Sequence, residues 1–201
     1  DIGYVRVDLM GRISTDNGQT WGEEFVIKSG TGTKGAIDCG FGDAALVADS
    51  ESDEGLLISV CGNTPYPNAT RSNPNPVARF RSHDNGKTWS DFENITESIY
   101  TLFDDSKLGA VNGLFFGSGR ICQSRLVKVG KYYRLYAALT ARPNGNRVIY
   151  SDDFGETWHA LGCLTVSPAP AGDEPKCEEL PDGTVILSSR MNGGRFYNLF
   201  T

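Results

Sequence analysis

The residues best placed to do chemistry flank a short predicted hairpin. Glu174 and Arg190 lie equally far before and after a Pro-Asp-Gly turn at residues 181–183, and the segments on either side are typical of strands. We therefore expect the carboxylate and the guanidinium to face each other at the open end of the hairpin, opposite the turn. Taken alone, the pair is compatible with a surface ion pair as well as with a catalytic or binding role.

Other reactive residue types are sparse. The sequence has two histidines, His83 and His159, and five cysteines without a Cys-x-x-Cys pair. This composition disfavours Ser-His-Asp catalysis and histidine-ligated zinc, so no metal site is expected. We interpret the cysteines as small buried residues with at most one disulfide, whose pairing stays open.

A motif of eight residues occurs three times and is the strongest signal in the sequence. The copies begin at Ser14, Ser82 and Ser151, follow the pattern Ser-x-Asp-x-Gly-x-Thr-Trp, and start 68 and 69 residues apart. In each copy the aspartate can accept hydrogen bonds from turn amides and the glycine tolerates a positive φ, so each copy predicts a hairpin tip. The tryptophan is expected to cover the end of the hairpin.

Because the motif is triplicated at a fixed turn position, we interpret Asp16, Asp84 and Asp153 as architectural rather than catalytic residues. Strands are expected around the tips, and a helical turn or two at 94–103. The expected strands are 43–49, 56–61, 76–81, 121–129, 132–140, 146–150, 176–180, 184–190 and 195–201.

The composition, with 24 glycines and nine prolines in 201 residues, is typical of an all-β protein with many turns. Repeating units of this length predict the blades of a β-propeller, each a small antiparallel sheet of about four strands. A closed ring needs at least four blades, whereas about three fit here. We therefore expect residues 1–201 to form roughly half of one propeller domain, completed by further sequence or by a second chain.

The three repeats match the Asp-box of sialidases, and the chain resembles this family of six-bladed propellers along nearly its whole length. Asp-boxes alone are moderately specific, because other propellers carry them. The pattern Glu-x3-Glu-Glu-Leu-x-Asp-Gly-x5-Ser-Arg at 174–190 is more diagnostic. It resembles the family segment with the glutamate that activates the nucleophile, here Glu174, and one arginine of the triad that binds the substrate carboxylate, here Arg190.

The resemblance implies roles for three further residues. Asp43, in the segment 40–49, is similar to the aspartate of the family's Gly-Phe-Ser-Asp-Pro segment, which lines the sugar pocket. Gln123 ends a segment, 118–123, that resembles the glycine-rich loop whose glutamine lies near the substrate. Asp1 lies 13 residues before the first repeat, about where the family has its acid–base aspartate.

Three family features have no counterpart in this sequence: the Phe-Arg-Ile-Pro motif with the first triad arginine, the nucleophilic tyrosine, and the last triad arginine. Tyr197 follows Arg190 too closely to be the nucleophile. We expect these groups outside the chain, and we expect residues 1–201 alone to be inactive.

The function implied by the resemblance is that of an exo-α-sialidase, a glycoside hydrolase that removes terminal α-ketosidically linked sialic acid with retention. A carboxylate nucleophile would be repelled by the carboxylate of the sugar, whereas a tyrosine deprotonated by Glu174 would not. Asp1 would protonate the leaving oxygen and later activate water. No cofactor is implied. Linkage preference, and hydrolysis as against trans-sialidase or anhydrosialidase chemistry, stay open.

The net charge and the hydropathy limit the classes of partner that we expect. The formal net charge is −6 and the pI about 4.9, so a broad basic surface for nucleic acid is not expected. The longest apolar stretch, 55–61, is too short to span a membrane. Expected partners are sialylated glycans or glycoproteins and the rest of the propeller, and the expected location is secreted, periplasmic or cell-surface, as in bacterial sialidases.

The alternative function is a non-catalytic Asp-box propeller that binds a glycan or a protein. An Asp-box glucan hydrolase with two carboxylates is disfavoured, because Glu174 and Arg190 have no role in one.

Overall fold

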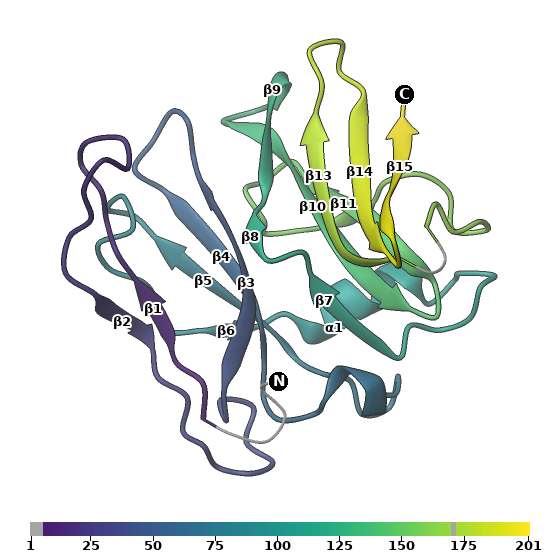
Figure 1. Ribbon diagram of the computed structural model, residues 1–201, viewed down its shortest axis with the longest axis horizontal. Coiled ribbons are helices and arrows are strands. Elements are labelled where there is room, and N and C mark those ends of the chain that lie inside the picture. Colours follow the sequence, from purple (N-terminus) through teal and green to yellow (C-terminus); the bar gives the residue numbers. More distant parts are fainter. Residues whose placement is uncertain (1–5, 170–171) are drawn as a thin grey trace.

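The computed structural model describes residues 6–169 and 172–201. Its strands form four sheets that follow one another in chain order, from the purple sheet at the left of Figure 1 to the yellow sheet at the upper right. The first contains β1 (Leu9–Gly11) and β2 (Phe25–Lys28), and the last contains β13 (Asp173–Glu179), β14 (Val185–Met191) and β15 (Gly194–Phe200).

The two middle sheets are four-stranded antiparallel meanders with one added strand each. The second sheet contains β3 (Phe41–Ala48), β4 (Gly55–Cys61), β5 (Val77–Ser82) and β6 (Glu93–Asn94), with β8 (Gly119–Arg120) parallel to β3. The third contains β7 (Gly113–Phe116), β10 (Tyr132–Arg142), β11 (Gly145–Ser151) and β12 (His159–Ala160), with β9 (Cys122–Val129) beside β10. Consecutive meanders of this kind are the blades of a propeller, and the expected all-β class is confirmed.

Helix is confined to short segments: η1 (Tyr66–Asn68), α1 (Thr96–Tyr100) and η2 (Thr101–Phe103). The last two lie where the sequence predicted a helical turn or two. In the described part of the chain, no helix is long and apolar enough to cross a membrane. All five cysteines lie in this part and are free, so the single disulfide that the sequence allowed does not form.

The three Asp-boxes form the same closed turn. In the second box the Ser82 hydroxyl donates to Asp84 at 2.9 Å and accepts the N–H of Gly86 at 2.8 Å. Asp84 also accepts the N–H of Thr88 at 2.9 Å and its hydroxyl at 2.6 Å. The first and third boxes repeat these bonds. The aspartates therefore hold the turns, as their interpretation as architectural residues requires.

One detail of the Asp-boxes differs from the sequence prediction. The residue before each glycine also has a positive φ, with values of 59°, 60° and 55° at Asn17, Asn85 and Phe154. Asparagine tolerates this conformation because its short polar side chain bonds locally, whereas phenylalanine does so rarely. Phe154 is almost fully buried and stacks on Tyr132, with ring centroids 5.1 Å apart, so packing holds the third turn.

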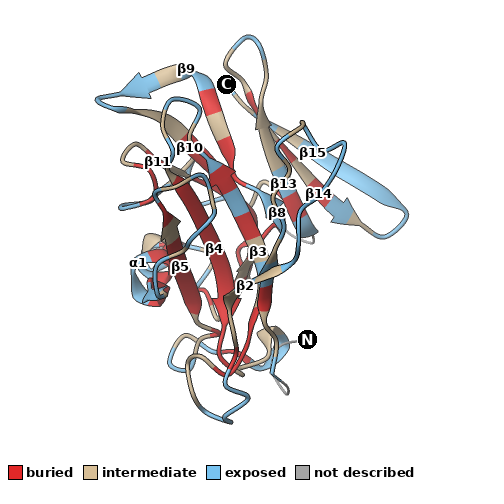
Figure 2. Ribbon diagram, turned by 90° about the vertical axis from the view of Figure 1, so that its left-hand side faces the viewer, coloured by how far each residue is buried: buried red, intermediate tan, exposed pale blue. Residues whose placement is uncertain are grey.

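The core lies between neighbouring sheets. Figure 2 shows buried residues along β4, β5, β10 and β11, and exposed ones along β15. All seven residues of β4 are buried. The largest apolar cluster joins the second and third sheets and includes Leu56, Tyr100, Phe116 and Trp158.

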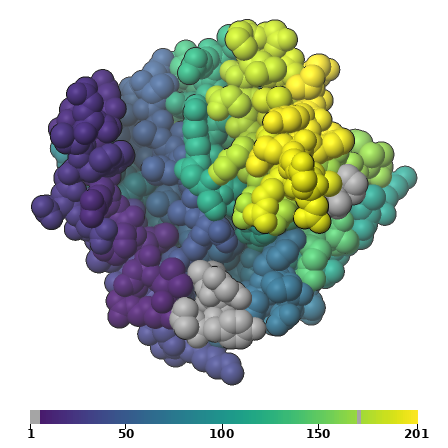
Figure 3. Space-filling view, in the orientation of Figure 1, coloured from purple at the N-terminus to yellow at the C-terminus, as the bar shows by residue number. Residues whose placement is uncertain are grey.

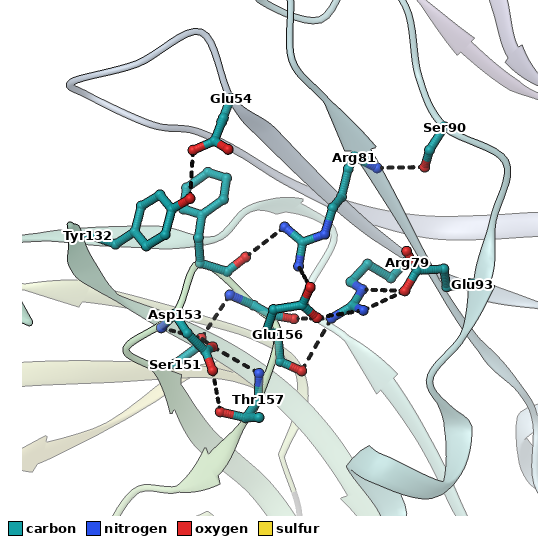
Figure 4. A network of polar contacts seen from close by, with 12 residues as sticks. Glu54, Arg79, Arg81, Ser90, Glu93, Tyr132, Ser151, Asp153, Glu156 and Thr157 are labelled. Carbon is teal, nitrogen blue, oxygen red and sulfur yellow. Dashed lines mark hydrogen bonds and ion pairs between the residues drawn. The ribbon is translucent and has the colours of Figure 1, made fainter. Parts of the chain in front are cut away.

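An arginine network adds a polar connection between the same two sheets (Figure 4). Arg79 of β5 donates to the carbonyl oxygens of Gly155, at 2.6 Å, and Glu156, at 3.2 Å, in the third Asp-box. Arg81 donates to the carbonyl oxygen of Phe154 at 3.1 Å. The Glu156 carboxylate lies 2.8 Å from Arg79 and 3.3 Å from Arg81. The third Asp-box thus binds two arginines of the neighbouring blade through its backbone carbonyls and the Glu156 carboxylate.

Candidate active site

The structure brings Glu174 and Arg190 together. Asp173 of β13 and Arg190 of β14 are directly opposite in the register, and Arg190 forms an ion pair with Glu174. At the other end of the hairpin, Gly183 has a φ of 88° and its N–H donates to the carbonyl of Leu180 at 2.9 Å, which closes the predicted turn. The hydrogen bond and charge of Glu174 raise the pKa of Arg190. Both side chains remain more than half exposed and are open to a ligand.

Two candidate site residues have an unusual backbone conformation. Of the five non-glycine residues with positive φ in the described ranges, three belong to the Asp-boxes, and the others are Asp43, at 47°, and Glu174, at 34°. Each lies where the strand register slips, in β3 against β4 and in β13 against β14. Bulges re-aim side chains, and strained backbone concentrates at functional sites. The two acids that the sequence analysis singled out are thus marked by their geometry as well.

The chain before β8 brings these two strands near each other. Ser118 donates to the Asp43 carboxylate at 3.2 Å. A Cβ on Gly117 would lie 1.9 Å from the carbonyl oxygen of Pro175, so only glycine allows β13 to pass this closely. Figure 3 shows the yellow C-terminal sheet standing against the teal middle part of the chain.

A cavity of about 480 Å³ opens beside Glu174 and is lined by Ser118, Glu174, Lys176, Ser188 and Arg195. Asp43 instead lines a neighbouring cavity of about 200 Å³. Burial and the nearby charge of Arg195 lower the pKa of Lys176. Three cations, Arg190, Lys176 and Arg195, thus lie around the two carboxylates of Glu174 and Asp173 in a chain whose net charge is −6, and this excess of cations favours an acidic ligand.

Sequence reasoning did not find Ser118, Lys176 or Arg195 as site residues. The hairpin register could have identified Lys176 and Arg195, because it places both on the strands beside Arg190. Lys176 pairs with Ser188, and Arg195 pairs with Arg190. Ser118 lies 75 residues from its partner Asp43, and no local pattern predicts that contact.

Gln123 is not brought to the other candidate residues. Its amide nitrogen donates to Asp49 at 2.6 Å, and its oxygen accepts the N–H of Ser50 at 2.9 Å. These partners follow β3, whereas Asp43 lies near the start of that strand. Gln123 lines a separate cavity of about 480 Å³, so its role in substrate binding stays a prediction. Asp1 lies outside the described residues.

No group of three or more His, Cys, Asp or Glu residues arranged to hold a metal ion occurs in the described ranges.

The repeats match a known family model, the BNR/Asp-box repeat, at residues 12–21, 80–91 and 149–160. The chain is 33% identical over 196 residues to a sialidase of Micromonospora viridifaciens, covering 90% of this chain and 28% of that protein. It is 30% identical over 204 residues to a sialidase of Paraclostridium sordellii, covering 96% of this chain and 47% of that protein. It thus spans between about a quarter and a half of these relatives.

Solved structures give the same fold. The Hadza microbial sialidase Hz136 superposes with a TM-score of 0.73 at 24% identity, covering 96% of this chain and 38% of that chain. The intramolecular trans-sialidase from Ruminococcus gnavus superposes with a TM-score of 0.70 at 16% identity, covering 96% and 61%.

The blades and their repeated turns define an Asp-box β-propeller, and the chain covers part of such a domain. Within that class, the repeats, the sequence relatives and the shared fold place the chain in the sialidase family.

Proposed function

We propose that the protein containing this chain is an exo-α-sialidase, a retaining glycoside hydrolase that removes terminal sialic acid from glycans and glycoproteins. The observation that carries this proposal is the ion pair of Glu174 and Arg190 at the cavity of the last sheet, with Glu174 on a bulge.

Arg190 is proposed to bind the carboxylate of the sugar. One of its nitrogens faces Glu174, and a guanidinium has five N–H donors, so donors remain for an incoming carboxylate. The cations at Lys176 and Arg195 favour the approach of this anion. Asp43 is proposed to line the sugar pocket, and Gln123, at its separate cavity, is proposed to contact the substrate.

Glu174 is proposed to act as the base that deprotonates a tyrosine nucleophile, and Asp1 as the acid–base residue for the leaving group. In this proposal the tyrosine and the other two arginines belong to the rest of the propeller. A neutral nucleophile suits this site, because the substrate and Glu174 are both negative. We further propose that the enzyme is secreted, periplasmic or at the cell surface, where sialylated glycans are displayed.

The test is release of sialic acid from a fluorogenic α-sialoside by the natural polypeptide that contains this chain, beside its Glu174→Gln variant. Loss of a catalytic base lowers rates by about 10²–10⁴-fold, and we expect a loss of this order with the fold intact. The matched control is Glu24→Gln, because Glu24 also pairs with an arginine, Arg12 at 3.5 Å, on an exposed surface. It should retain full activity.

A folded parent protein that is inert on every sialoside linkage would contradict the proposal. The alternative of a propeller that binds a glycan or a protein would then stand, with Glu174 and Arg190 as a hairpin ion pair.

A further inference from the structure

The cavity beside Glu174 is lined by Arg195, an arginine that the proposed mechanism uses only as a charge. Arg195 lies at the start of β15, directly opposite Arg190. Its Nε donates to the Ser188 hydroxyl at 2.6 Å, and one Nη donates to the Ser188 carbonyl oxygen at 3.1 Å. The same Nη donates to the backbone carbonyl oxygen of Glu174 at 3.3 Å. One guanidinium therefore joins β14 to the bulge in β13.

The backbone of Glu174 has little support from the strand ladder. The pairing of β13 with β14 slips between Asp173 and Lys176, and Glu174 has a φ of 34°. Its N–H donates to the side chain of Asp173 at 2.9 Å, and the next residue, Pro175, has no N–H to give. Side chains thus replace ladder bonds here, and Arg195 supplies the donor for the Glu174 carbonyl.

We propose that Arg195 is a positioning residue for Glu174. By binding the carbonyl oxygen, its guanidinium holds the Glu174 peptide in the left-handed conformation, and this conformation aims the carboxylate at Arg190 and the cavity. Without this bond, the backbone relaxes toward negative φ, the ordinary conformation of a non-glycine residue, and turns the carboxylate away. The catalytic consequence rests on the proposed function, whereas the geometric one does not.

The kinetic test uses the natural polypeptide that contains this chain, with the substitutions Arg195→Gln and Arg195→Lys. A displacement of about 1 Å at a catalytic group costs about 100-fold in rate. We therefore expect Arg195→Gln to lower kcat on a fluorogenic α-sialoside by about 10- to 100-fold. KM should rise by less than kcat falls, because one nearby cation is lost but Arg190 still binds the sugar carboxylate. Arg195→Lys keeps a donor and a charge and should recover part of kcat.

The matched control is Arg12→Gln, which removes the same group from an exposed ion pair with Glu24 in the first sheet. It should leave both kinetic constants unchanged. A purely structural role of Arg195 would instead lower the amount of folded enzyme, with kcat per folded molecule unchanged.

Crystal structures of the parent and the Arg195 variants give a readout that is independent of activity. We expect Glu174 to move to negative φ and its ion pair with Arg190 to open in Arg195→Gln. If the parent is inert but Glu174 moves, the positioning role holds and the proposed function fails. If Glu174 stays in place in both variants, the positioning role is overturned, whether or not activity falls. If Glu174 moves in Arg195→Gln but activity stays full, the positioning role holds and the proposed role of Glu174 as the base fails.

Discussion

At the scale of single residues, each Asp-box is a closed unit in which one carboxylate binds both polar groups of a threonine. In the second box the hydroxyl and the N–H of Thr88 are the main causes that lower the pKa of Asp84 to about 2. The first box does the same for Asp16 through Thr20, again to about 2. The carboxylates of these two aspartates thus interact with groups of their own turn, which agrees with their interpretation as architectural residues.

The pH dependence of stability follows from this lowered pKa. Because the folded value is below the ordinary value of 3.8, the contribution of Asp84 is complete above about pH 4 and is lost as the pH falls through about 2. We expect Asp84→Asn to lower the melting temperature at pH 6 and to have a much smaller effect at pH 2. Thermal unfolding across this range measures it. An equal effect of Asp84→Asn at both pH values would contradict the prediction.

The candidate site shows what single residues reveal in the sequence and what they do not. The pairing of Glu174 with Arg190 was predictable, because a two-strand hairpin fixes which residues meet across it. The hydrogen bonds of Gln123 to Asp49 and Ser50 were not, since they join residues more than 70 positions apart. Such contacts depend on how blades pack, and no local pattern records that.

At the scale of elements, the strands with alternating or long apolar patterns were predictable and β7 was not. Its sequence, Gly-Leu-Phe-Phe, is four residues long and has no alternation, because three of the four residues are buried. The close approach of β13 to the end of β7 could not be predicted from the sequence either, since it depends on a contact between Gly117 and Pro175, which lie far apart in the chain. Yet this approach places the cavity beside Glu174.

Gly117→Ala tests the importance of this approach. The new Cβ would lie 1.9 Å from the Pro175 carbonyl oxygen, and backbone atoms cannot yield as a flexible side chain does. We expect the free energy of unfolding to fall by about 1–3 kcal/mol, the usual cost of overpacking, and sialidase activity to fall with the displacement of Glu174. Denaturant titration and turnover of a fluorogenic sialoside measure the two effects.

The control for this substitution is Gly194→Ala, because a Cβ at Gly194 meets no atom within 4 Å. It should cost much less stability. If both alanine variants unfold alike, the contact between Gly117 and Pro175 does not constrain the position of β13.

At the scale of the whole molecule, the second and third blades are joined by an apolar core and by polar contacts, among them those of the buried cation Arg79. Arg79 is 7% exposed, yet its guanidinium contacts Glu93 of its own blade and Glu156 of the next. A buried arginine with several acceptors is costly to remove, because the buried carbonyl oxygen of Gly155 is left without a donor. The sequence did not predict this network, since its two halves lie more than 70 residues apart.

We expect Arg79→Met to weaken the interaction between the second and third blades and so to lower the free energy of unfolding. The carbonyl oxygens of Gly155 and Glu156 lose their donor and Glu93 loses its cation, whereas the Glu156 carboxylate keeps Arg81, so the free energy of unfolding should fall by about 1–3 kcal/mol. The matched control, Arg12→Met, breaks an exposed ion pair and should cost at most about 1 kcal/mol. Denaturant titration of both variants in the natural polypeptide compares them directly. A cost of Arg79→Met no larger than that of the control would mean that the apolar core around Phe116 and Trp158 and the remaining polar contacts hold the two blades together without Arg79.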